Sequence, residues 1–223
     1  MREPPGYVPI LVIRLALIAA PGLANTFSAF GPQTYPRGTG APVTAKATFV
    51  VLNPSTQYVV RLRTGSVASA VVAVNGVTVI DPSQFNANVT SIEAPVTLKA
   101  VNELAVEVRG GPGGTIVLEI IGIDNEPPSI VANATPPPNG LGWNNSNVTV
   151  TFTCADSTSG IATCPPPVQV SSEGQSQSVA GTAIDKAGNS ATANVIVNLD
   201  RTPPLVTSSQ SPGANPNGWN NTP

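Results

Sequence analysis

A gap-free internal repeat is the feature of this 223-residue sequence that most constrains its fold. The stretch from Asp124, DNEPPSIVANATPPPNGLGWNNS, aligns with the stretch from Asp200, DRTPPLVTSSQSPGANPNGWNNT, and nine of the 23 aligned residues are identical. Aligned residues lie 76 positions apart, which is the size of a small β-sandwich domain arrayed in tandem. We therefore expect one complete unit at residues 124–199 and the truncated start of a second at residues 200–223, as in a fragment of a longer array. Because so short a start cannot bury a core, residues 202–223 are expected to be poorly ordered.

The complete unit has the alternation that is typical of β-strands. Within residues 147–154, apolar side chains and a cysteine take every second position, and threonines take most of the others. The last strand repeats this pattern, and its inward residues are expected to be Ala191, Ala193, Val195, Val197 and Leu199. Turn-forming residues at 185–189 predict a hairpin that leads into this strand. Since a single sheet cannot cover its own apolar face, we expect two packed antiparallel sheets.

Five motifs occur in order along the unit: Asp-x-x-Pro-Pro, Gly-Trp-x-Asn, Val-Thr-Val-Thr-Phe-Thr-Cys, Asp-x-x-Ser-Gly-Ile-Ala and Asp-Lys-Ala-Gly-Asn. With them, residues 124–199 and the partial copy resemble the bacterial immunoglobulin-like repeats of large secreted and cell-surface proteins. The resemblance implies an immunoglobulin-like sandwich that acts as a non-catalytic spacer, stalk or adhesive module. The segment from Phe30 to Ile123 also looks like a module that precedes such repeats.

The amino-terminal part also reads as a series of strands. We expect them at residues 43–52, 57–63, 68–74, 77–80, 96–101, 104–109 and 116–123. Asn75-Gly76 lies between two β-branched runs and predicts a tight hairpin. Residues 102–103 and 110–114 are interpreted as the next two reversals. So many short strands again predict a sandwich, followed by a stiff linker at residues 124–128, where Pro127 and Pro128 each fix φ.

An apolar segment at residues 10–24 is typical of an exported protein. Its fifteen residues include Arg14, so it is shorter than the about 20 apolar residues of a membrane span. The small residues Gly22 and Ala24 suit a signal-peptide cleavage site between Ala24 and Asn25. A buried N-terminal helix is the alternative interpretation.

The composition excludes several functional classes. With no histidine, the chain lacks Ser-His-Asp and Cys-His catalysis and the commonest metal ligand. Ten Lys plus Arg residues and a pI near 5.0 argue against a nucleic-acid surface. Glu103, Glu107 and Glu119 are the carboxylates in or beside predicted strands, and their spacing does not indicate the facing pair of a glycosidase. We expect neither enzymatic activity nor a cofactor.

Cys154 and Cys164 are the only cysteines. In an exported chain they are expected to form a disulfide that stabilises the folded state by about 2–3 kcal/mol. Two free thiols are the alternative. Zinc is disfavoured because two sulfurs without a histidine fall short of its four ligands.

Asp156, Asp185, Asn189 and Asp200 are candidate oxygen ligands for Ca²⁺, although turn formation explains them more simply. We therefore expect no metal site. Five Asn-x-Ser/Thr sequences are interpreted as incidental, and they begin at Asn88, Asn133, Asn144, Asn147 and Asn220.

The only two tryptophans, Trp143 and Trp219, occupy equivalent positions in the repeat. They are expected to be packing anchors against a neighbouring domain. The alternative is a ring that stacks on a sugar beside Asn144 and Asn145.

The sequence thus predicts an all-β chain of two tandem antiparallel sandwiches, the second immunoglobulin-like, after a cleavable signal peptide. The boundaries are 1–24 for the signal peptide, 25–123 for the first module, 124–199 for the repeat and 200–223 for the partial copy. The predicted function is a non-enzymatic spacer or adhesion region of an exported bacterial surface protein. The alternative is a carbohydrate-binding accessory module of a secreted hydrolase. The expected partners are a cell-surface glycan or protein and tandem copies of the repeat, with no nucleic acid and no integral membrane segment.

Overall fold

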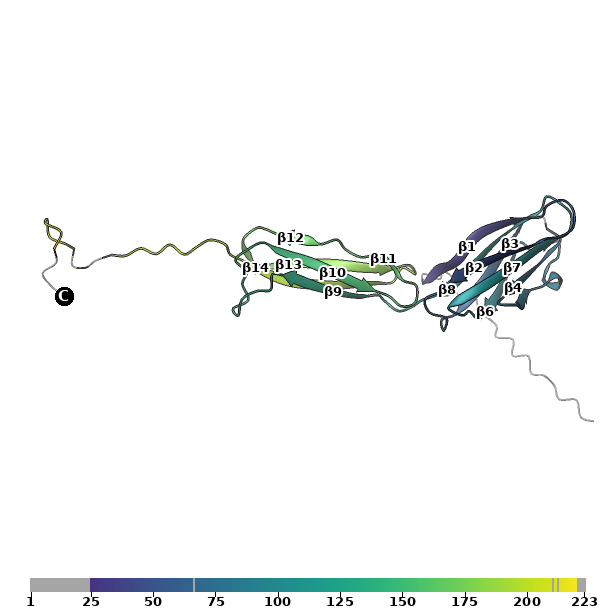
Figure 1. Cartoon of the computed structure of the whole chain (residues 1–223), viewed down its shortest axis with the longest axis horizontal. Coiled ribbons are helices and arrows are strands. Elements are labelled where there is room, and N and C mark those ends of the chain that lie inside the picture. Colours follow the sequence, from purple (N-terminus) through teal and green to yellow (C-terminus); the bar gives the residue numbers. More distant parts are fainter. Residues whose placement is uncertain (1–24, 66, 210, 212, 220–223) are drawn as a thin grey trace, which may run out of the picture.

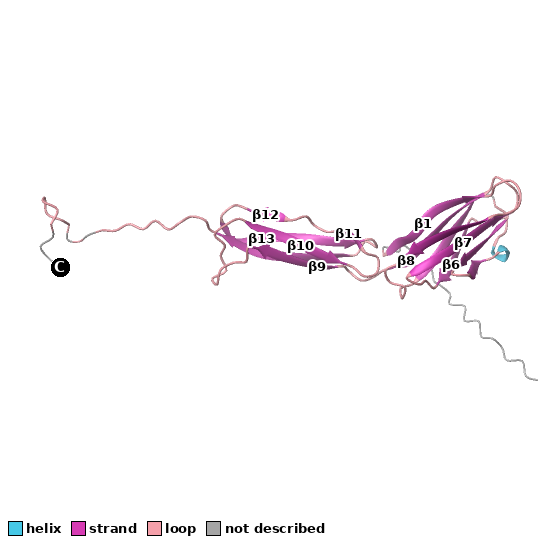
Figure 2. Cartoon of the chain, viewed as in Figure 1, coloured by secondary structure: helices cyan, strands magenta, loops and turns pink. Residues whose placement is uncertain are grey.

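The computed structural model describes residues 25–65, 67–209, 211 and 213–219. Over these residues it contains fourteen strands and one short 3-10 turn, η1 (Pro82–Gln84), so the all-β prediction is confirmed. The strands form two sandwiches that lie end to end (Figures 1 and 2). The predicted signal peptide and Ala24 lie outside the described residues, as does Asn220. Within the described part, no helix has the length and apolar character needed to cross a membrane.

The first sandwich contains eight strands in two four-stranded antiparallel sheets. They are β1 (Thr26–Pro36), β2 (Thr44–Val50), β3 (Tyr58–Gly65), β4 (Ser69–Val74), β5 (Val77–Ile80), β6 (Ser91–Val96), β7 (Val101–Arg109) and β8 (Thr115–Ile123). One sheet has the order β1-β8-β3-β6 and the other β2-β7-β4-β5. Alternate side chains of both sheets point inward, so that residues such as Leu62, Leu104 and Leu118 are fully buried in one core.

Two details of the first sandwich differ from the sequence prediction. The strand expected at residues 96–101 lies earlier, at β6, and the reversal expected at 102–103 lies just before β7. The cause is Asn102, which is 1% exposed. Its side chain accepts the N–H of Lys99 and donates to the carbonyl of Lys99, so an asparagine inside the strand holds the preceding turn closed. Strand β1, which pairs with β8 through two irregularities of register, was not predicted.

The second sandwich contains six strands in two three-stranded sheets. They are β9 (Ser129–Thr135), β10 (Val148–Ala155), β11 (Ile161–Thr163), β12 (Val168–Val170), β13 (Gly174–Asp185) and β14 (Ser190–Leu199). The sheets have the orders β12-β10-β9 and β11-β13-β14, and the predicted hairpin joins β13 to β14. The main buried apolar cluster is small and consists of Val148, Val150, Val170, Val197 and Leu199.

The predicted disulfide between Cys154 and Cys164 is confirmed, with Cα atoms 5.9 Å apart. Cys154 lies on β10 and Cys164 directly follows β11, so the bridge links the two sheets. This covalent link supplements a small buried apolar cluster.

The described residues beyond Leu199 contain no strand, but one local structure is repeated there. In the complete unit, the amides of Leu141 and Trp143 donate to the side chain of Asn139. In the partial copy, the amides of Asn217 and Trp219 donate to the side chain of Asn215 in the same way. The glycine before each tryptophan has φ = +83°, which favours glycine. The aligned sequences therefore form the same turn.

Candidate functional site: the junction between the two sandwiches

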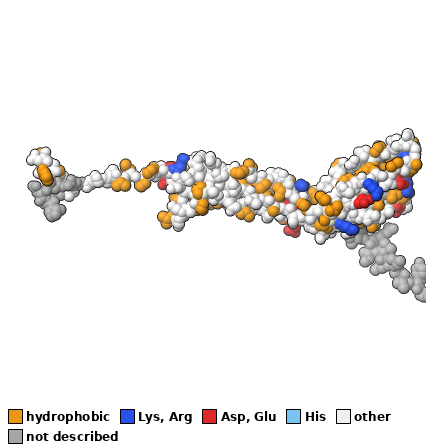
Figure 3. Space-filling view, viewed as in Figure 1, with side chains coloured by type: hydrophobic (Ala, Val, Ile, Leu, Met, Phe, Trp, Pro, Cys, Tyr) orange, Lys and Arg blue, Asp and Glu red, His pale blue; other side chains and the backbone are white. Residues whose placement is uncertain are grey.

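Three of the six buried polar or charged residues in the described part of the chain lie at the junction between the two sandwiches: Asp124, Ser159 and Asp185. Only four charged residues lie between positions 129 and 199, and Asp156, Asp185 and Lys186 are three of them. Figure 3 shows that the visible face of the second sandwich is otherwise mostly uncharged. Asp156, Asp185 and Lys186 lie at the turns after β10 and after β13, and both turns face the first sandwich (Figure 1). We therefore describe the junction as the candidate site.

Asp124 is the central residue of the junction. It follows β8 directly and is 2% exposed. Its amide donates to the carbonyl of Asn25 at 2.9 Å, which holds it against the first sandwich. Its carboxylate accepts the amide of Glu126 through Oδ1 and that of Ser159, in the second sandwich, through Oδ2, each at 3.1 Å. One buried carboxylate is thus bonded to both the linker and the second sandwich.

The turn at residues 156–160 presents the Ser159 amide to Asp124. Asp156 Oδ1 accepts the amides of Thr158, Ser159 and Gly160, at 3.1, 2.8 and 2.7 Å. This side-chain-to-backbone pattern is the reason that aspartate begins such a turn. Gly160 closes it with φ = +83°, a conformation that favours glycine.

The β13–β14 hairpin holds the linker from its other side. Asp185 Oδ1 accepts the amides of Ala187 and Asn189, at 2.8 and 2.9 Å, and so fixes the shape of the hairpin. The side-chain amide of Asn189 then donates to the carbonyl of Asp124 at 2.9 Å and to that of Glu126 at 3.3 Å. The Asp-Lys-Ala-Gly-Asn motif is therefore both a turn and a clamp on the interdomain segment.

Direct contacts across the junction complete the site. Ala187 is 5% exposed and belongs to the apolar core of the first sandwich. Asn53 donates from its side chain to the hydroxyl of Thr158 at 3.1 Å. The Leu52 side chain lies 3.2 Å from the point where a Cβ on Gly160 would stand. These apolar and polar contacts fix one end-to-end orientation of the two sandwiches.

The structure brings together part of the residue set considered for calcium. Asp156 and Asp185 offer oxygens that lie within 4.8 Å of each other and of Asp124. Asn189 directs its amide donor toward Asp185 Oδ2, and Asp200 follows β14 at the opposite end of the sandwich. Calcium takes about six to eight oxygen ligands. Each of the three carboxylates accepts at least one backbone amide.

Asp124 was not among the residues singled out from the sequence as ligands or contacts. The available signal was the repeat, because Asp124 aligns with Asp200, which was singled out. The same residue type therefore begins the linker segment of both copies.

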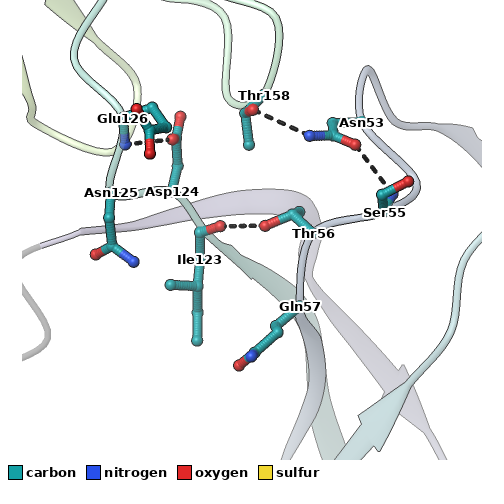
Figure 4. Close-up of a pocket in the computed structure, with 9 residues that line it drawn as sticks. All are labelled: Asn53, Ser55, Thr56, Gln57, Ile123, Asp124, Asn125, Glu126 and Thr158. Atoms are coloured by element: carbon teal, nitrogen blue, oxygen red, sulfur yellow. Dashed lines mark hydrogen bonds between the residues drawn. The ribbon is translucent and has the colours of Figure 1, made fainter.

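An open, shallow pocket of about 370 Å³ lies beside the junction (Figure 4). Its lining is polar except for Ile123, and the other lining residues are Asn53, Ser55, Thr56, Gln57, Asp124, Asn125, Glu126 and Thr158. Several of their polar groups are already bonded to one another: Thr56 donates to the carbonyl of Ile123, and Asn53 to Thr158. Binding pockets for small molecules are mostly apolar and enclosed, so this one does not resemble such a site.

Trp143 and Trp219 differ in exposure. Trp143 is half-buried at the end of the second sandwich, whereas Trp219 is 72% exposed in the partial copy. Asn144, expected beside Trp143 in a glycan site, is buried and donates from its side chain to the carbonyl of Pro136 at 2.9 Å. Asn145 is exposed. The structure therefore brings the tryptophan and only one of the two asparagines to the surface.

The three glutamates considered for catalysis lie on outer sheet faces in ion pairs. Glu103 pairs with Lys46 at 2.9 Å and Glu119 with Arg61 at 3.3 Å. Glu107 pairs with Arg109, which lowers the pKa of the Glu107 carboxyl. Glu103 and Glu107 therefore form surface ion pairs rather than a facing carboxylate pair.

Comparisons with known proteins add little to this description. No family model matches the chain, and no curated protein sequence matches it. Among solved structures, the exo-chitosanase CsxA of Amycolatopsis orientalis is similar at 14% identity with a TM-score of 0.30. The similarity covers 70% of this chain and 25% of the chitosanase, so the chain spans about a quarter of that enzyme's length.

Proposed function

We propose that the chain is a non-enzymatic spacer or interaction region of an exported bacterial surface protein. The observation that carries the proposal is the junction, where Asp124 is bonded to both sandwiches. A spacer must hold the parts that it joins at a fixed separation. A hydrogen-bonded, partly apolar junction resists the bending that a free linker would permit. In this proposal the second sandwich is an immunoglobulin-like repeat.

Export is supported by the disulfide, since such bonds persist in oxidising compartments. The polar, weakly charged surface of the second sandwich is compatible with an extracellular spacer (Figure 3). Residues 1–24 serve, in this proposal, as the leader that directs export.

The test of the spacer function is whether the natural chain behaves as one elongated body. Small-angle X-ray scattering of the chain should give the maximum dimension of two sandwiches placed end to end. A truncated chain that ends at Leu199 serves as control for the contribution of the partial copy. Scattering that requires many relative orientations of the two sandwiches would contradict a spacer with a fixed junction.

The carbohydrate-binding alternative predicts a different result. A glycan array with the natural chain and with Trp143→Ala should then show binding that depends on the half-buried ring. We expect no glycan signal above background for either protein. Binding that disappears in Trp143→Ala would assign the accessory-module function instead.

A further inference from the structure

The exit from the second sandwich repeats the exit from the first. Asp124 follows β8 and donates its amide to the carbonyl of Asn25 at 2.9 Å. Asp200 follows β14 and donates its amide to the carbonyl of Asn144 at 3.0 Å. Each aspartate then uses Oδ1 to accept the amide two residues ahead, Glu126 at 3.1 Å and Thr202 at 3.0 Å. The two aspartates, 76 residues apart, thus share backbone and side-chain geometry.

The two exits differ in one contact. Asp124 Oδ2 accepts the amide of Ser159 and is covered by the second sandwich. Asp200 is exposed, and among the described residues its Oδ2 accepts no hydrogen bond. The β9–β10 connection lies at the same end of the sandwich (Figure 1), and its residue Leu141 is 87% exposed.

We propose that this end of the second sandwich, defined by Asp200 and Leu141, is a docking surface for another copy of the same repeat. The proposal rests on the spacer function and names its partner. The docked copy places its Asp-x-x-Ser-Gly turn on Asp200, so that its serine amide donates to Oδ2 as Ser159 does to Asp124. Its Asp-Lys-Ala-Gly-Asn hairpin clamps the carbonyl of Asp200, as Asn189 clamps that of Asp124.

The chemistry of the surface selects this partner. The free carboxylate oxygen at the exit can accept a donor, and the repeat supplies a preformed one in the Asp156 turn, where the Ser159 amide is already oriented. The partial copy also begins with the same turn, at Asn215, as the complete unit has at Asn139. A second copy can therefore enter in register without new local structure.

The proposal is tested with an extended chain in which the second copy of the repeat is complete. The natural chain is extended after Thr222 with a duplicate of residues 147–199, which continues the alignment without a gap. Hydrogen exchange is then measured at the Arg201 and Thr202 amides. The duplicated segment does not include these residues, so their signals come from one place in the extended chain. We expect exchange at these amides to slow at least about tenfold in the extended chain relative to the natural chain.

The variant Asp200→Asn keeps one acceptor oxygen and removes the second. In the extended chain it should reverse most of that protection. The matched control is Asp81→Asn, since Asp81 also accepts an amide two residues ahead, that of Ser83, but lies in the first sandwich. Circular dichroism shows whether the added copy folds.

Three outcomes would overturn the inference: unchanged exchange at 201–202 on extension, equal effects of Asp200→Asn and Asp81→Asn, or an added copy that does not fold. These outcomes leave the proposed function standing, because scattering from the natural chain tests the spacer independently. A flexible first junction would instead overturn the spacer function while the exchange experiment still reports on Asp200.

Discussion

The side-chain amide of Asn189 donates to the backbone carbonyl of Asp124 at 2.9 Å, and this bond connects positions 65 residues apart. Asn189 belongs to the tip of a hairpin, and Asp124 belongs to the segment between the sandwiches. The Asp-Lys-Ala-Gly-Asn motif therefore has two roles. It forms a local turn, and it also determines how the two sandwiches are joined. The interdomain segment is ordered by side chains as well as by its two prolines.

We first predict that Asn189→Ala destabilises the second sandwich. The substitution removes donors to Asp124, Glu126 and Asp185 and leaves a buried carboxylate short of a partner. The expected loss in the free energy of unfolding is about 1–3 kcal/mol. Tryptophan fluorescence in a urea titration measures it, because both tryptophans follow Asp124 in the sequence.

Asn194→Ala is the matched control, since Asn194 lies exposed on the same strand, β14, and makes no side-chain hydrogen bond among the described residues. Equal destabilisation by the two variants would contradict a specific role for Asn189.

A second prediction concerns the disulfide. Reduction, or the double substitution of Cys154 and Cys164 by serine, should lower the unfolding free energy of the second sandwich by about 2–3 kcal/mol. The effect should be large relative to total stability because the buried apolar cluster of that sandwich is small. The first sandwich contains neither cysteine, so its unfolding transition is an internal control. Calorimetry with and without reductant should move one transition and leave the other in place.

The sequence was most informative where a structure depends on neighbouring residues. Asn75-Gly76 predicted the β4–β5 hairpin, and both residues have the positive φ values, 52° and 80°, that a tight hairpin turn requires. Alternation likewise predicted β10 and the inward face of β14. These features follow from period-two patterning and turn chemistry, which act within a few residues.

Three features of the structure were not predicted in this way. Asn102 was interpreted as a turn residue, although it lies within a strand and closes the turn that precedes it. Strand β1 contains a glycine and prolines that obscure its pattern. The meeting of Asp124, Asp156 and Asp185 depends on how two sandwiches pack, and no local rule encodes that.

The third prediction tests packing between the sheets of the second sandwich. A Cβ added to Gly181, on β13, would stand 2.6 Å from the Phe152 ring and 2.8 Å from Pro165. Gly181→Ala should therefore destabilise this sandwich by about 1–3 kcal/mol through overpacking. Gly140→Ala is the control, because a Cβ there has no atom within 4 Å. A Gly181→Ala protein as stable as Gly140→Ala in a urea titration would show that the sheets separate without strain.

The last prediction concerns the pH dependence of the first sandwich near the junction. Burial, and then the negative charge of Asp124, raise the pKa of the Tyr58 phenol above its ordinary value of 10.0. The Tyr58 hydroxyl also donates to the carbonyl of Asn53 at 2.8 Å, a bond that only the protonated phenol can make. Because the folded state holds this proton more tightly than the unfolded state, the stabilisation is complete below pH 10.0 and is lost as the pH rises through the folded-state pKa.

Ultraviolet absorbance of the phenolate should detect this late-titrating tyrosine, and Tyr58→Phe should remove it from the titration curve. The pKa of Tyr35 is also raised by burial, so that phenol remains as an internal reference in the variant. Asp124→Asn should shift the titration of Tyr58 back toward its ordinary pKa, since it removes the charge contribution while burial stays. The decisive comparison is the slope of unfolding free energy against pH above 10.0, which should be less steep in Tyr58→Phe than in the natural chain. Identical slopes in the two proteins would mean that Tyr58 ionises equally easily in the folded and unfolded states.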